Sequence, residues 1–141
     1  MVEYNLKDWP YILIKFGPTV DQSIFDEHIK NLLNLYETAK TKNERMTIIF
    51  DLNQLSKCPM KYILKQGAVN KKLNSLSKMY INETFFLTSS NFIKNILDIL
   101  FTFEKPTRPY KIFSNREKFK TYLSNKINNI NQSYEHINIL K

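Results

Sequence analysis

The 141-residue sequence contains little cysteine, histidine or glycine. Cys58 is its one cysteine, and it has two histidines and two glycines. A single cysteine excludes an intramolecular disulfide and any metal site built from several cysteines, and it favours a reducing compartment. With two glycines, the chain has neither the Walker phosphate-binding loop nor the dinucleotide fingerprint. The composition therefore lacks the residues on which common cofactor and metal motifs depend.

A catalytic set is also missing. A nucleophile needs a base within hydrogen-bond reach and a third group that orients the base. Nothing in the sequence brings His28, Cys58 and an acid together. Asp51 ends an apolar segment, and we interpret it as a turn residue that bonds the backbone after it. We therefore expect no enzymatic activity, no cofactor and no metal.

No segment has the character of a membrane span. The longest apolar-rich stretch, 92–103, contains Lys94, Asn95 and Asp98 and is too short to cross a bilayer. The first eight residues have no basic start followed by an apolar run, as a signal peptide would. These features predict a cytoplasmic protein.

The net charge of +8 is unevenly distributed. Residues 1–50 hold six basic and seven acidic side chains, whereas 51–141 hold fifteen basic and six acidic ones. Lys61, Lys65 and Lys72 share one face of a predicted helix. This basic face would attract nucleic acid or anionic lipid without base-specific recognition. A solvated lysine-rich surface is the alternative.

Four short segments rich in β-branched and aromatic residues predict strands at 11–16, 46–50, 84–88 and 110–113. Tyr4 and Leu6 suggest a further antiparallel strand before Trp9. The continuous apolar run at 46–50 is typical of a strand covered on both faces.

Apolar residues at helical spacing predict helices over about 20–40, 59–79 and 92–103, and from 115 to about 127. Ser89, Ser90 or Asn91 would cap the third. Ser114 to Glu117 has the form of a capping box before the fourth. The stripe of the first helix is Phe25, Ile29, Leu32, Leu33 and Tyr36, and that of the third is Phe92, Ile96, Ile99, Leu100 and Phe103.

The alternation of strands and helices indicates an α/β fold with a mostly parallel sheet of four to five strands and about four helices. Residues 1–128 are expected to form one domain, because this length supports a single core. The asparagine-rich residues 129–141 are expected to form a C-terminal tail.

In this arrangement the chain resembles the STAS or SpoIIAA-like superfamily, which is similar in outline to the CRAL-TRIO fold. The segments that carry the resemblance are 9–14, 48–53, 84–90 and 109–119. The resemblance implies a non-enzymatic regulatory or partner-binding module. A carrier of a small apolar ligand, of CRAL-TRIO type, is an alternative in which aromatic side chains line a cavity.

The resemblance also implies the position of a phosphorylation site. In the anti-sigma antagonists of this superfamily, an Asp-Ser pair follows the central strand and the serine is phosphorylated. The matching positions here are Pro59 and Met60, which cannot accept a phosphoryl group. The phosphoserine switch is therefore not carried over, and we interpret Ser56 as a loop serine.

The third predicted helix has a second apolar row beside its core stripe. Ile93, Leu97 and Phe101 recur at i, i+4 and i+8. The outer side of a helix on a small, doubly covered sheet faces water, so an apolar row there indicates a contact surface. We expect Ile93, Leu97 and Phe101 to bind a protein partner or a second copy of the chain. Coverage by the C-terminal isoleucines 127, 130, 137 and 139 is the alternative.

A further candidate lies at the carboxyl edge of the predicted sheet, where loops after parallel strands gather. Ser56 and Lys57 would lie there beside Ser89 and Ser90, and the third helix would begin at the gap. Helix N-termini attract anions, so these residues predict an anion site. Helix capping alone is the alternative role for the serines.

Overall fold

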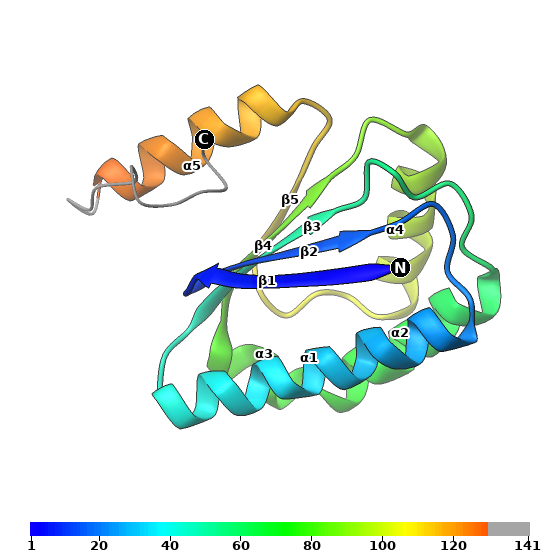
Figure 1. Cartoon of the computed structure of the whole chain (residues 1–141), viewed down its shortest axis with the longest axis horizontal. Coiled ribbons are helices and arrows are strands. Elements are labelled where there is room, and N and C mark those ends of the chain that lie inside the picture. Colours follow the sequence, from blue (N-terminus) through cyan, green and yellow to red (C-terminus); the bar gives the residue numbers. More distant parts are fainter. Residues whose placement is uncertain (130–141) are drawn as a thin grey trace.

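The computed structural model describes residues 1–129 and is shown in Figure 1. It has the α/β fold that the sequence predicts, with five strands and five helices. Its elements are β1 (Val2–Asp8), β2 (Tyr11–Phe16), α1 (Gln22–Lys42), β3 (Met46–Asp51), α2 (Met60–Lys72), α3 (Asn74–Tyr80), β4 (Ile81–Leu87), α4 (Asn91–Phe103), β5 (Tyr110–Phe113) and α5 (Arg116–Asn129). The strand suggested by Tyr4 and Leu6 is confirmed as β1.

The five strands lie in the sheet in chain order, β1-β2-β3-β4-β5. β1 and β2 are joined by a tight turn and pair antiparallel, while every later pair is parallel and joined through helices. Because each crossover moves to the next strand in the same direction and with the same hand, α1 to α4 cover one face. Figure 1 shows α5 on the opposite face.

The alternation of side chains along each strand separates two hydrophobic clusters. On β4, Phe86 faces the helices α1 to α4, whereas its neighbour Phe85 faces α5. The cluster under α5 contains six buried residues, namely Ile49, Phe85, Leu87, Phe119, Leu123 and Ile127. β3 and β4 therefore have apolar residues on both faces, as the continuous apolar run of β3 predicted.

Two helix boundaries differ from the predictions. The helix predicted over 59–79 is two helices, α2 and α3, separated at Leu73. The apolar stripe of the predicted helix continues across this break, so periodicity alone could not reveal it; its residues are Tyr62, Val69, Leu73, Leu76 and Tyr80. The predicted cap of the last helix is wrong by one residue, because Asn115 rather than Ser114 accepts the N–H groups of Glu117 and Lys118 at the start of α5. Ser90 is confirmed as the cap of α4, through its bond from the Ile93 N–H.

The expected tail, residues 129–141, lies outside the described residues except for Asn129, the last residue of α5. Of the helices within residues 1–129, none has both the length and the apolar character that crossing a bilayer requires.

Candidate functional site

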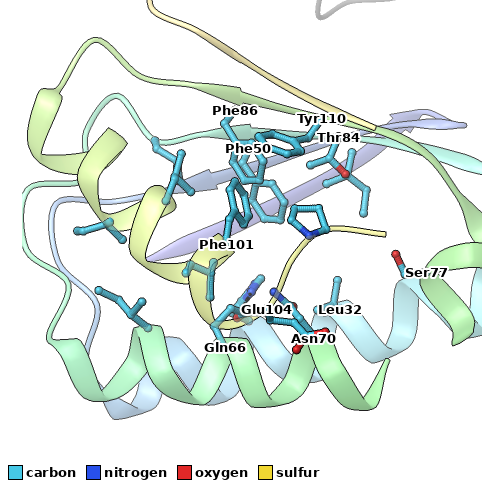
Figure 2. A pocket seen from close by; sticks show the side chains of 18 of the residues that line it. Leu32, Phe50, Gln66, Asn70, Ser77, Thr84, Phe86, Phe101, Glu104 and Tyr110 are labelled. Carbon is cyan, nitrogen blue, oxygen red and sulfur yellow. Dashed lines mark hydrogen bonds between the residues drawn. The ribbon is translucent and has the colours of Figure 1, made fainter. Parts of the chain in front are cut away.

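A cavity of about 220 Å³, partly open to solvent, lies between the sheet and helices α1 to α4. Figure 2 shows the aromatic rings of Phe50, Phe86 and Tyr110 on its sheet side. Phe50 and Phe86 are stacked with ring centroids 5.3 Å apart, and the Phe101 ring of α4 lies 4.6 Å from that of Tyr110. The connection from α4 to β5, residues 104–109, borders the same space. The sheet side of the cavity is thus an aromatic surface.

The helical side of the cavity carries a chain of hydrogen bonds. His28 Nε2 donates to Gln66 Oε1 (3.1 Å), and Gln66 Nε2 donates to Asn70 Oδ1 (2.8 Å). At the other end, the Tyr4 hydroxyl donates to His28 Nδ1 (2.7 Å). The chain links β1, α1 and α2, and it fixes the imidazole as the tautomer protonated on Nε2.

Burial determines the charge state of the tyrosines and the histidine in this region. It lowers the pKa of His28 to about 4, although the bond to Gln66 acts in the opposite direction. Burial also raises the pKa of Tyr4, and it raises that of Tyr36 to about 12. These groups are therefore neutral near pH 7, and the interior wall of the cavity carries dipoles rather than charges.

Among residues 1–129, the charged groups that line the cavity all belong to the connection from α4 to β5. The Arg108 guanidinium donates to the backbone carbonyls of Ile81 (2.9 Å) and Asn82 (3.4 Å), which ties this connection to the start of β4. The carboxylate of Glu104 has no hydrogen-bond or ion-pair partner among residues 1–129. Figure 2 shows Glu104 beside Gln66, at the helical side of the cavity.

The size of the cavity limits what it can hold. It is larger than the engineered apolar cavity of about 150 Å³ that binds benzene. It is smaller than drug-sized sites, which occupy about 300–1,000 Å³. The space of about 220 Å³ therefore fits one small molecule and is too small for a two-chain lipid.

The predicted contact row on α4 needs correction. Ile93 and Leu97 are 1% and 4% exposed and belong to the core, and the Phe101 ring packs on Phe86. They therefore do not form an exposed surface in the folded chain. α4 is apolar nearly all round, so its periodicity identifies two apolar rows without showing which one faces the sheet. Of the isoleucines that would cover α4 in the alternative, residues 130, 137 and 139 lie outside the described residues. Ile127 belongs to α5 and is buried against the face of the sheet opposite to α4.

The two exposed rings of α4, Phe92 and Phe103, belong to the row that the sequence assigned to the core. Phe92 is 51% exposed and Phe103 is 65% exposed, with Ile96 and Ile99 half-buried between them. The side chains of this row recur at i, i+4, i+7 and i+11, so they form one stripe along the helix. We call Phe92, Ile96, Ile99 and Phe103 the outer row of α4.

Two serines of the predicted anion site, Ser56 and Ser90, have other partners. Ser56 donates its hydroxyl to the Pro18 carbonyl (3.1 Å), which also accepts the N–H of Lys57. Ser90 caps α4, while Ser89 is exposed. The loop after β3 is thus tied to the loop after β2, and capping accounts for Ser90. Anion binding by these residues stays a prediction.

The basic face is present on α2. Lys61 and Lys65 both lie over the Tyr62 ring, with their Nζ atoms 5.0 and 5.6 Å from its centroid. Lys72 is exposed at the end of the same helix. Lys65 also donates to Gln22 Oε1 of α1 (3.3 Å). A role in binding nucleic acid or anionic lipid stays a prediction.

Asp51 and Cys58 have structural surroundings. Asp51 accepts the backbone N–H and the side-chain amide of Asn53, both at 3.1 Å, which confirms its interpretation as a turn residue. Burial raises the pKa of the Cys58 thiol, so the thiol form is favoured. Within residues 1–129, no three His, Cys, Asp or Glu side chains are grouped as a metal site requires.

Sequence reasoning missed the polar wall of the cavity. Gln66 and Asn70 follow Tyr62 at i+4 and i+8, so they share its inward face on α2. His28 lies between Phe25 and Leu32, at the spacing of the apolar stripe of α1. The sequence does place these polar residues among the apolar residues of each helix. This placement indicates a polar wall only once the inward face of each helix has been assigned correctly.

No family model and no curated protein sequence matches the chain. The chain is similar to known proteins in its structure only. An uncharacterized protein of the DUF3478 family from Shewanella loihica PV-4, with a SpoIIAA-like fold, is similar at a TM-score of 0.58 and 10% identity, over 87% of this chain and 92% of that one. The anti-sigma factor antagonist SpoIIAA, in its unphosphorylated form, is similar at a TM-score of 0.58 and 12% identity, over 88% and 97%. The chain therefore has the STAS/SpoIIAA-like fold that its sequence resembles.

Proposed function

We propose that the protein is a non-catalytic interaction module that pairs with a second copy of itself through the outer row of α4. The exposed rings of Phe92 and Phe103 are the observation that carries this proposal. Large aromatic side chains are enriched at protein interfaces and depleted from the rest of the surface. The likeness in fold to an anti-sigma factor antagonist, a protein that acts on another protein, supports an interaction role.

The charges on α4 suit contact between two copies. Lys94 and Asp98 lie one turn apart on α4 and are its only charged residues. One lysine and one aspartate leave the side chains of α4 without net charge, so two copies of the helix do not repel each other. α2 is unsuited to such pairing, because it carries four lysines and no acid and would repel its copy.

The test is the molecular mass in solution at micromolar concentration, by sedimentation or light scattering. We expect a dimer for the unchanged chain and a monomer for the double variant Phe92→Glu, Phe103→Glu, since both charges would be buried in the interface. Met79→Glu is the matched control, because Met79 is similarly exposed but lies on α3. It should leave the dimer intact. A monomeric unchanged chain would overturn the proposal.

The cavity favours a second candidate function, which is carriage of a small apolar ligand. Its aromatic sheet side and its neutral helical side are typical of ligand sites. Mass spectrometry of an organic extract of the protein, purified from its native source, should then find one small molecule in stoichiometric amount. Repeated extracts without such a molecule would count against this function.

A further inference from the structure

We propose that the cavity binds an uncharged molecule made of a single ring or a short branched chain that bears one hydroxyl group. This inference rests on the second candidate function and names its ligand class. Figure 2 shows the arrangement that carries it: aromatic rings on the sheet side, and Gln66, Asn70 and Glu104 gathered on the helical side. The ligand would place its apolar part against the rings and its hydroxyl toward Asn70 and Glu104.

The size of the ligand follows from the volume. Benzene has six non-hydrogen atoms and binds in an apolar cavity of about 150 Å³. The cavity of about 220 Å³ therefore holds about nine such atoms at the same density. A ring with two small substituents has this size, whereas a long-chain lipid does not fit.

The hydroxyl group of the ligand is inferred from the donor and the acceptor at the helical side of the cavity that have no hydrogen-bond partner within the described part of the chain. Gln66 uses its oxygen for His28 and its nitrogen for Asn70, which leaves the Asn70 Nδ2 as a donor. The Glu104 carboxylate supplies an acceptor without a partner among the described residues. A hydroxyl group accepts from one and donates to the other at the same time.

The residues that line the cavity favour an uncharged ligand. The connection from α4 to β5 carries Glu104 beside Lys105 and Arg108, so it presents both signs of charge and favours neither sign on the ligand. Either charge would also have to leave water for a wall of aromatic rings and neutral amides. The bound group is therefore polar and neutral.

The test uses two probes of equal size, each with nine non-hydrogen atoms. 4-Ethylphenol carries a hydroxyl, and 4-ethyltoluene has a methyl group in its place. Titration of the full chain, followed by two-dimensional NMR, should give a Kd below about 1 mM for 4-ethylphenol and about tenfold weaker binding for 4-ethyltoluene, since one hydrogen-bond pair is lost. The shifted methyl signals should belong to Leu32, Ile48 and Leu97, from the walls around the cavity.

Two variants assign the roles within the site. Asn70→Leu keeps the size of the side chain and should weaken 4-ethylphenol about tenfold while leaving 4-ethyltoluene unchanged. Thr84→Phe places a ring in the cavity and should abolish binding of both probes. Its folding is checked by the spectrum of the free protein, and the methyl map of the unchanged chain locates the site independently of this variant.

The outcomes separate the inference from the function on which it rests. Equal affinity for both probes would overturn the hydroxyl-bearing class and leave a carrier of apolar ligands. Shifts confined to methyl groups outside the cavity, or no binding of either probe, would overturn the site. The double variant Phe92→Glu, Phe103→Glu should bind 4-ethylphenol as the unchanged chain does, because neither Phe92 nor Phe103 lines the cavity.

Discussion

On one face of the sheet a single helix, α5, places Phe119, Leu123 and Ile127 directly against β3 and β4, whereas on the other face four helices leave a cavity of about 220 Å³. The α5 face is packed ring against ring, with Phe119 5.3 Å from Phe85 and 5.6 Å from Phe113 between centroids. The face covered by four helices is thus less completely packed than the face covered by one. More helices bring more contacts among themselves, but these contacts do not fill the space above the sheet.

The faces also differ in how they hold buried polar groups. Under α5, the buried carboxylate of Glu83 pairs with Lys126, and Tyr122 donates to it. Although burial acts to lower the pKa of Lys126, its hydrogen bond and charge interaction with Glu83 raise it. On the cavity face, the corresponding buried polar groups are the neutral chain of Tyr4, His28 and Gln66. The buried polar groups of the α5 face are thus a charged pair, whereas those of the cavity face are neutral.

The largest expected loss of stability comes from two adjacent phenylalanines of β4, which face opposite sides of the sheet. Phe85→Ala should lower the free energy of unfolding by about 3–5 kcal/mol, the usual cost of emptying a filled aromatic site. Phe86→Ala should cost about 2–3 kcal/mol, because the ring already borders open space and mainly its transfer from water is lost. Both are measured by urea denaturation. Equal losses would show that the two faces are packed alike.

Acid sensitivity should come from the cavity face. The pKa of His28 is about 4 in the folded chain and about 6.5 in the unfolded chain, so the unfolded state binds more protons between these values. Stability is therefore full above pH 6.5 and falls as the pH drops toward 4, by about 2 kcal/mol at pH 5. Urea denaturation at pH 8 and pH 5 measures this loss.

The variant His28→Leu supplies the comparison for the acid effect. It removes the titrating group, so its stability should change less between pH 8 and pH 5 than that of the unchanged chain. An identical loss in both proteins would place the acid sensitivity elsewhere in the molecule.

The sequence predicted the sheet better than the site because strands and helices leave different signals. The runs at β2 and β3 are short, continuous and bounded, so both their existence and their parallel order could be inferred. For α4, the two apolar rows are equally regular, and only the position of the sheet decides that Ile93 faces inward and Phe92 outward. Periodicity contains no information on which row is covered.

The cavity could not be predicted for a related reason. Its walls are made by residues far apart in the chain, such as Leu32, Gln66 and Phe86, and it exists only through the distance between two layers. The local patterns around these residues are those of ordinary amphipathic elements. A void is a property of packing between elements, so no single segment records it.

The smallest effect concerns the packing among the helices above the cavity. Gly67, in the middle of α2, faces α4, and a Cβ atom built on it would lie 3.6 Å from Leu100 Cδ1, at ordinary contact distance. Gly67→Ala should therefore raise the free energy of unfolding by about 0.5–1 kcal/mol, since alanine is the better helix former and no atom has to move. Gly67→Leu, which must push α2 away from α4, is the contrasting variant and should destabilise the chain. If Gly67→Ala were also destabilising, α2 and α4 would lie closer than contact distance, and the incomplete filling of this face would reflect strain between its helices rather than their spacing from the sheet.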